Sequence, residues 1–171
     1  MLDVSRNRLV LAVSFLCAVA GAGWLLHAHL AGSRETTFLR PHDRAVVARG
    51  EGLYRAHCAA CHGVPGTTET GDARLDAPPH DAGGHTWEHP DYALFQLIRD
   101  GVAVANCVPV DPDRMPKFRG IVSDAGLVAI LSFIKSTWPD ALRSHHDRVN
   151  VMYGPYNRAV GELIGVGDAA E

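Results

Sequence analysis

The sequence predicts an all-α protein in which three main helices form one small domain behind an apolar N-terminal helix. Apolar residues recur at helical spacing in three separate stretches between residues 43 and 138. The run from Leu9 to Leu26 carries no charged residue over 18 positions. A chain of 171 residues is long enough for one domain plus an extra segment. We therefore expect a single soluble domain over residues 42–139.

The N-terminal run, residues 9–26, reaches the lower limit of length for a membrane-spanning helix. Arg6 and Arg8 precede it, and by the positive-inside rule residues 1–8 stay in the cytoplasm. This predicts a single-pass anchor in the cell inner membrane, followed by a linker over residues 27–41, with the domain on the periplasmic side. The alternative is a cleaved signal peptide and a soluble periplasmic protein, because Ala18-Val19-Ala20 fits a cleavage site.

The first and third helices of the domain are predicted to cross. Asp43 is a suitable cap for the first helix, which has Gly50 and Tyr54 on one face. A glycine is costly inside a helix unless another backbone must come close. Ser123 is the expected cap of the third helix, which Pro139 ends. We expect its Leu131, Phe133 or Ile134 to pack on Gly50 and Tyr54.

A second helix is predicted from about Pro90 to Asp100, with Pro90 at its first position and Gly101 just after its end. The segment 140–171 lies beyond the three helices as a C-terminal extension. Tyr156, Val160 and Leu163 predict a short amphipathic helix there. The extension either folds back on the domain or docks a partner subunit.

The sequence Cys58-Ala59-Ala60-Cys61-His62 has the spacing that attaches a c-type haem. One helical turn brings both thiols to one side, where each can form a thioether, and His62 can bind the iron. A redox pair or a zinc half-site is the alternative. Zinc would need a second ligand pair, and the other cysteines, Cys17 and Cys107, are isolated. The motif predicts one covalent haem c.

A long stretch rich in Gly, Pro, Thr, Asp and His, residues 63–88, follows the motif without a helical or alternating pattern. Such loops are usually functional, and we expect this one to wrap the cofactor with Trp87 among its apolar contacts. The histidines His80, His85 and His89 are spaced five and four apart. They either donate hydrogen bonds to haem propionates or cap the next helix, or they bind a second metal such as copper or zinc.

The order of helix, CAACHG, loop, helix, Met115-Pro116-Lys117-Phe118 and closing helix resembles that of the class I monohaem cytochromes c, here of the membrane-anchored bacterial type. The resemblance covers about residues 40 to 138. It implies that His62 is the fifth ligand of the iron, with its Nδ1 proton donated to the carbonyl of Pro78 or Pro79. It also implies that Met115 is the sixth ligand. Met152 or a loop histidine remains a rival of Met115.

The implied function is electron transfer without turnover of a substrate, between a donor such as a quinol-oxidising complex or a dehydrogenase and an acceptor such as a terminal oxidase or reductase. A fixed haem subunit of an oxidoreductase is the first alternative. A haem peroxidase or gas sensor with a labile sixth ligand is the second. The formal charge of −3 argues against a nucleic-acid partner. Near Met115, the basic residues Arg114, Lys117 and Arg119 either steer an acidic partner or are simply solvated.

Overall fold

The chain forms two compact units, Met1–Glu35 and Thr36–Glu171, in a computed structural model that describes residues 4–34, 36–75, 77–104 and 115–165. The first unit contains α1 (Val4–Arg34), whose side chains are described over residues 11–27. Within the described residues, no helix combines the length and the apolar character that a membrane span requires.

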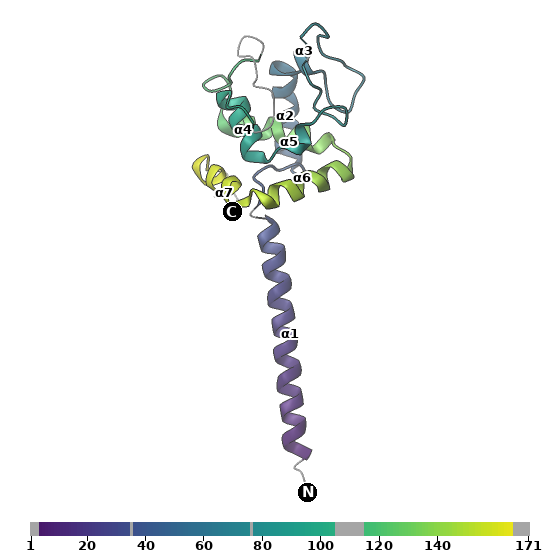
Figure 1. Ribbon diagram of the computed structural model, residues 1–171, viewed down its shortest axis with the longest axis vertical. Coiled ribbons are helices and arrows are strands. Elements are labelled where there is room, and N and C mark those ends of the chain that lie inside the picture. The colour runs from purple at the N-terminus through teal and green to yellow at the C-terminus, as the bar shows by residue number, and fades with distance from the viewer. Residues whose placement is uncertain (1–3, 35, 76, 105–114, 166–171) are drawn as a thin grey trace. The chain divides into compact units, whose positions relative to one another are not determined.

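The second unit is helical, and the described residues contain no β-strand, only an isolated bridge between Arg119 and Val122. The prediction of an all-α domain is therefore confirmed (Figure 1). Its elements, in chain order, are α2 (Arg44–His57), α3 (Ala59–His62), the 3₁₀ helix η1 (Thr86–Glu88), α4 (Asp91–Asp100), α5 (Asp124–Thr137), α6 (Asp140–Met152) and α7 (Gly154–Leu163).

The crossing of α2 and α5 is the centre of the second unit, as the glycine in the first predicted helix indicated. Asp43 caps α2, because its Oδ1 accepts hydrogen bonds from the backbone N–H groups of the second and third helical residues. A Cβ on Gly50 would lie 2.0 Å from the carbonyl oxygen of Ala129 and 2.9 Å from Cβ of Phe133. The rings of Tyr54 and Phe133 lie 5.4 Å apart. Phe133, one of the three predicted contact residues, meets both Gly50 and Tyr54.

Replacing Gly50 with alanine is expected to lower the free energy of unfolding by about 3 kcal/mol, because the new methyl group meets backbone atoms that cannot move independently. Urea unfolding followed by circular dichroism measures this loss. Gly52, in the same helix, has nothing within 4 Å of its Cβ position, and Gly52→Ala is the matched control. We expect the control to raise stability by up to about 1 kcal/mol. Equal effects of the two substitutions would contradict the close crossing.

The second predicted helix corresponds to α4, with one difference at its start. Pro90 is extended, with φ −69° and ψ 156°, so it precedes the first helical residue instead of occupying that position. Gly101 ends α4 in the left-handed conformation, with φ +69°. Ser123 caps α5 through its Oγ, which accepts from Gly126 N. The residues that begin and end these two helices were correctly predicted to within one position.

The C-terminal extension contains two helices that pack on the rest of the second unit, whereas the sequence predicted only the later one. Helix α6 contacts η1, and α7 contacts α4. In Figure 1, α6 and α7 follow one another along one side of the unit in green and yellow. The extension thus folds back, which was the first of the two alternatives.

The contact between the extension and the domain is made by a buried polar network around Asp91. Asp91 is fully buried, and its Oδ2 accepts from Thr37 Oγ1 at 2.5 Å and from Phe38 N at 3.2 Å. Its Oδ1 accepts from Asn150 Nδ2 at 2.9 Å. The amide of Asn157, on α7, donates to Asn150 Oδ1 at 2.8 Å. Residues of both C-terminal helices are therefore tied to the beginning of α4 and to the segment that opens the unit.

His146 completes this network as a neutral side chain. Its Nε2 lies 2.9 Å from the carbonyl oxygen of His89 and 3.5 Å from Oδ1 of Asp91. Burial lowers the pKa of His146 to about 4, and the nearby carboxyl group of Asp91 opposes this shift only in part. At neutral pH the imidazole therefore donates a hydrogen bond to His89 and forms no ion pair with Asp91.

Candidate functional site

The two cysteines and the histidine of the motif lie on a single helical turn. Cys58 joins the end of α2 to the start of α3, and its carbonyl oxygen accepts from Cys61 N at 3.1 Å and His62 N at 3.0 Å. Both thiols are half-buried and form no disulfide. Burial, with a contribution from Cys61, raises the pKa of the Cys58 thiol to about 12. Cys58 is thus a protonated thiol held in place by the helix before it.

His62 has one ring nitrogen occupied and the other available. Its Nδ1 lies 2.8 Å from the carbonyl oxygen of Pro78, the first of the two acceptors implied by the resemblance. A proton on Nδ1 donated to this oxygen leaves the lone pair of Nε2 free for a metal. Burial lowers the pKa of His62, although the hydrogen bond to Pro78 opposes it. The neutral imidazole, which is the form that binds metals, is therefore favoured.

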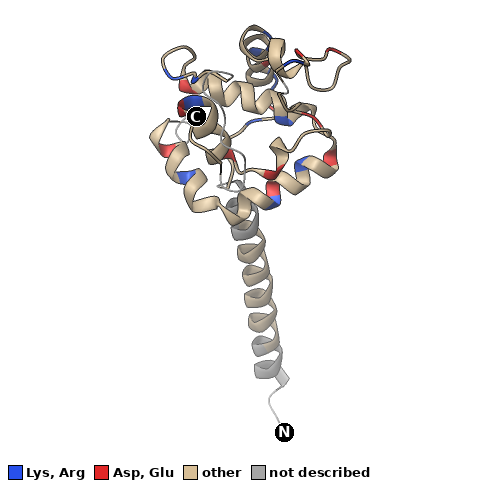
Figure 2. Ribbon diagram, turned by 45° about the horizontal axis from the view of Figure 1, so that its top comes forward, with Lys and Arg blue, Asp and Glu red and all other residues tan. Residues whose placement is uncertain are grey.

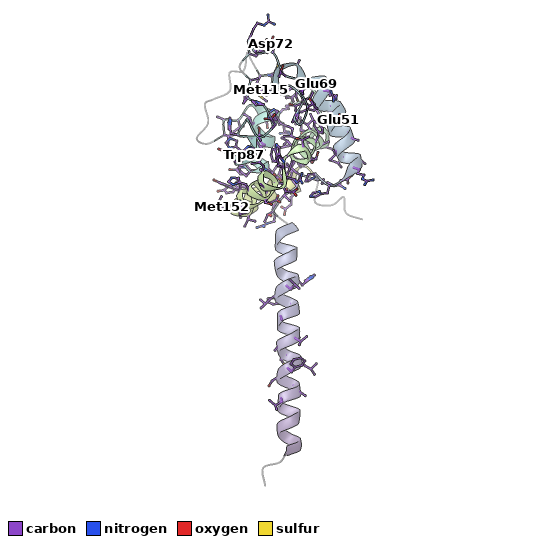
Figure 3. All side chains as sticks on the ribbon, turned by 90° about the vertical axis from the view of Figure 1, so that its right-hand side faces the viewer. Glu51, Glu69, Asp72, Trp87, Met115 and Met152 are labelled. Carbon is purple, nitrogen blue, oxygen red and sulfur yellow. The ribbon has the colours of Figure 1, made fainter. Side chains whose placement is uncertain are left out.

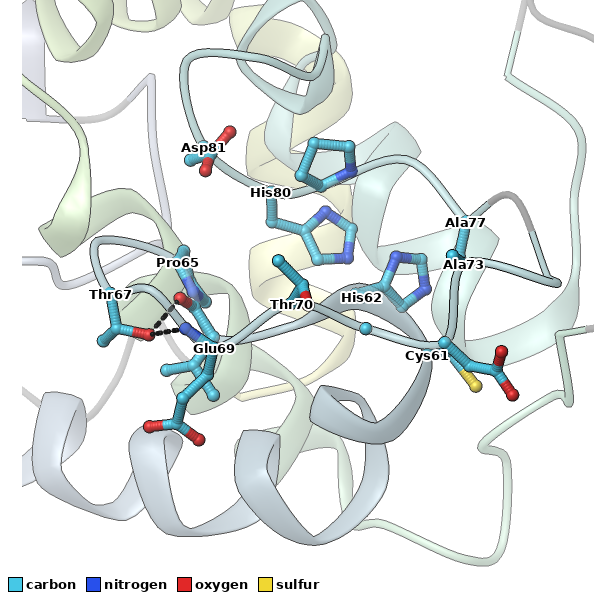
Figure 4. A pocket seen from close by; sticks show the side chains of 14 residues that line it. Cys61, His62, Pro65, Thr67, Glu69, Thr70, Ala73, Ala77, His80 and Asp81 are labelled. Carbon is cyan, nitrogen blue, oxygen red and sulfur yellow. Dashed lines mark hydrogen bonds between the residues drawn. The ribbon is translucent and has the colours of Figure 1, made fainter.

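A cavity of about 370 Å³ lies beside this turn and is bordered by Cys61, His62 and the loop that follows. Figure 4 shows the loop side chains around it, among them Pro65, His80 and Asp81. The loop folds closely onto the motif, because Asp72 N donates to the carbonyl oxygen of Ala60 at 3.0 Å. Pro79 also borders the cavity. The loop is thus fixed against the motif by a backbone hydrogen bond, and its wrapping of the cofactor stays a prediction.

Tyr54 contributes an unusual group next to the motif. The residue is fully buried, and its hydroxyl is the one buried side-chain polar atom, among those the structure describes, that has no hydrogen-bond partner. Burial raises the pKa of Tyr54, with smaller contributions from Cys58 and Asp81. A buried donor without a partner is costly unless a further group meets it. With two thiols, an available imidazole nitrogen and a cavity beside them, this residue set fits a covalently bound haem.

The loop histidines make different ring contacts. The rings of His80 and His62 stack with their centroids 4.3 Å apart, while the rings of His85 and His89 meet edge to face at 5.4 Å. In the part of the chain that the structure describes, no group of three or more His, Cys, Asp or Glu residues could hold a metal ion. The hypothesis of a second metal at His80, His85 and His89 therefore lacks support.

Met115 lies half-buried at the start of a segment that the fold brings to the motif. Phe118, three residues later, donates its N–H to the carbonyl oxygen of Ile98 at 3.0 Å. The ring of Phe118 meets that of His57, the residue directly before the first motif cysteine, with the ring centroids 6.1 Å apart. Met152 is 70% exposed, and Figure 3 shows it well apart from Met115. Of the two methionines, Met115 has the more suitable surroundings for a haem ligand.

Trp87 packs against the hydrophobic core of the second unit, and its predicted contact with the cofactor stays a prediction. Its Nε1 donates to the carbonyl oxygen of Gly84 at 3.1 Å. The centroids of its ring and the ring of His145 lie 5.2 Å apart. Trp87 is absent from the residues that border the cavity. Trp87 thus joins the loop to α6.

The basic residues near Met115 are less free than the sequence suggested. Arg119 Nε lies 2.5 Å from Oδ1 of Asp100. The stem of Lys117 covers Gly101, since its Cε is 2.8 Å from the Cβ position of that glycine. Both signs of charge are interspersed over the second unit in Figure 2. Arg114, like Cys107, lies outside the described residues.

Residues 45–134 match the family model described as cytochrome c oxidase, cbb3-type, subunit III, which covers more than half of the chain. The chain belongs to this family. The matched range contains the whole CxxCH turn, the cavity loop and Met115. The cbb3-type subunit III family binds covalent haem c, so the cofactor predicted from the motif is confirmed. No solved structure matches the chain.

Membership in the family makes this protein a haem-c electron-transfer protein, either a carrier or an oxidase subunit. It acts with redox partners or within an oxidase complex. Sequence reasoning missed the orphaned hydroxyl of Tyr54 and the role of His80, because both depend on which side chains meet in space. The four-residue spacing from Tyr54 to Cys58 was the available signal for the first, since it places Tyr54 one helical turn before the first motif cysteine.

Proposed function

We propose that this protein transfers single electrons through one haem c attached to Cys58 and Cys61, with His62 as the fifth ligand and Met115 as the sixth. When bound, the haem supplies a one-electron iron couple. The observation that supports this most strongly is the hydrogen bond from His62 to Pro78, because it orients an imidazole for ligation beside two unpaired thiols.

The residues of this chain then have distinct parts in the function. The two thiols fix the cofactor in one place, and Pro78 sets the tautomer of His62. A thioether from Met115 favours ferrous over ferric iron and fills the position where small ligands would bind. The tight crossing of α2 and α5 holds the motif in the same geometry in both redox states.

Replacing Met115 with alanine is expected to open the sixth position. The wild-type ferric protein should show the weak absorption band of a methionine–iron bond near the red end of the spectrum, and the reduced protein should refuse carbon monoxide. Met115→Ala should lose the band and bind carbon monoxide readily, because Met152, the other methionine of the second unit, is 70% exposed and lies apart from Met115. Met152→Ala is the matched control and should behave as wild type. Carbon monoxide binding by the wild-type protein would instead favour a peroxidase or gas sensor.

Two further parts of the proposal concern location and partners. We place the haem domain on the periplasmic side of the inner membrane, attached by residues 9–26, because this stretch has no charge and follows two arginines. Carbonate extraction of membranes from cells that produce the full chain tests the attachment. N-terminal sequencing of the mature protein tests the alternative of a cleaved signal peptide.

A second candidate function is a fixed subunit of a cbb3-type oxidase, and the family match favours it. The exposed apolar side chains at the end of the chain also suit a subunit contact, for example Tyr156 at 60% and Leu163 at 82% exposure. Stoichiometric co-purification with other oxidase subunits would support the fixed subunit. Purification of the protein alone, with rapid reduction by a dehydrogenase or a quinol-oxidising complex, would support the free carrier.

A further inference from the structure

His80 is the side chain that covers one face of the proposed iron ligand. The ring centroids of His80 and His62 lie 4.3 Å apart with an interplanar angle of 28°, which is a stacked arrangement. Figure 4 shows the two rings side by side at the cavity. The hydrogen bond to Pro78 acts at the edge of the same ring, on Nδ1. His62 is therefore restrained from two directions, at its edge and on its face.

The position of His80 is itself fixed by three neighbours from different parts of the chain. Its Nδ1 lies 2.8 Å from the hydroxyl oxygen of Thr86. Its backbone carbonyl accepts from Nε1 of Trp138, at the end of α5, at 2.8 Å. The ring of Tyr54, on α2, meets it edge-on at 6.0 Å. A ring held in this way can restrain another ring, whereas a loosely held side chain would follow it.

We propose that His80 is a positioning residue for His62, which fixes the plane of the axial imidazole by stacking and excludes water from one of its faces. The proposal rests on the proposed ligation of the haem by His62. The relevant property is the flat ring, because a flat surface at 4.3 Å opposes tilting of its neighbour. His80 touches His62 and is not itself assigned as a ligand.

Removal of this ring should have two measurable effects. Tilting of His62 changes the orientation of the axial imidazole plane, which alters the g values in the EPR spectrum of the ferric protein. Water that reaches the uncovered face stabilises the more highly charged oxidised state. We expect the ratio of reduced to oxidised His80→Ala protein, at a fixed ambient potential, to fall by about threefold.

The experiment compares three full-length variants that carry haem with the wild-type protein. His80→Ala removes the ring and should show both effects, whereas His80→Phe keeps a flat ring and should keep the wild-type EPR spectrum and redox ratio. His85→Ala, which removes a histidine of the same loop that does not stack on His62, should leave both unchanged. Should His80→Ala fail to fold, His80→Leu replaces it, because leucine fills the space without a flat face.

Several outcomes would overturn the proposal. Wild-type EPR spectra and redox ratios in His80→Ala would do so, and so would identical spectra for the leucine and phenylalanine variants. An equal shift in His80→Phe and His80→Ala would assign the effect to the hydrogen bond with Thr86 instead. Failure of the proposed function is recognised separately. In that case the wild-type protein itself would lack a covalent haem bound through the motif.

Discussion

Replacement of both Cys58 and Cys61 by alanine is expected to abolish covalent attachment of haem. Each thioether needs its own sulfur, and among the described residues of the second unit Cys58 and Cys61 are the two that carry a thiol. The helix itself should survive, because alanine is the best helix former. The double variant should therefore lose the covalent bonds to haem while it keeps the helical turn. A single substitution should leave the haem attached by one bond.

Haem staining after denaturing electrophoresis and acid–acetone extraction measure this effect in protein made with a working maturation system. The wild-type protein should keep its pigment through both, while the double variant should lose it entirely. Cys17→Ala is the matched control, because it removes an exposed thiol of α1, outside the second unit. Pigment that survives extraction from the double variant would show that the motif is not the attachment site.

Replacement of Asp91 by alanine is expected to lower the free energy of unfolding by about 3 kcal/mol, because several buried donors then lack a partner. The carboxyl group accepts from Thr37 Oγ1, from Phe38 N and from Asn150 Nδ2, and all of these contacts are buried or partly buried. A water molecule could satisfy these donors in place of the carboxyl group only if the buried site had room for it. We also expect α6 and α7 to separate from the domain before the rest unfolds.

Thermal unfolding measures the overall loss, and hydrogen exchange of the α6 and α7 amides measures the local one. Asp140→Ala is the matched control, since the side chain of Asp140 is 92% exposed and pairs only with Arg143 at the surface. We expect the control to lose less than about 1 kcal/mol. A small effect of Asp91→Ala, similar to that of the control, would mean that the buried network does not hold the extension.

Much of the fold followed from local sequence signals. Asp43 as a cap, Gly50 as a crossing point and Gly101 as a helix end each depend on the chemistry of one residue. The CxxCH turn is equally local, because five consecutive residues define it. Such features need no knowledge of distant contacts, and they therefore located α2, α4, α5 and the cofactor.

The parts that sequence reasoning missed depend on contacts between distant residues. Helix α6 buries His146 and Asn150, which are polar, so its inward face carries little apolar signal. Their partner Asp91 lies 59 residues away from Asn150 along the chain. The same holds for His80, whose stacking on His62 and bond to Trp138 connect the loop to the end of α5. The histidine-rich loop allowed metal binding as one of two alternatives, and only the three-dimensional arrangement shows which ring each of these histidines meets.

The crossing of α2 and α5 also has a consequence for the order in which this protein matures. Helix α2 ends at His57, and its packing partner α5 begins at Asp124. The pair can close only when the chain through Thr137 is present, and the long segment between the two helices adds a loop-closure cost that their packing has to offset. The CxxCH turn directly follows α2 and is complete at His62, so the attachment site exists in the chain before the helix pair beside it can form.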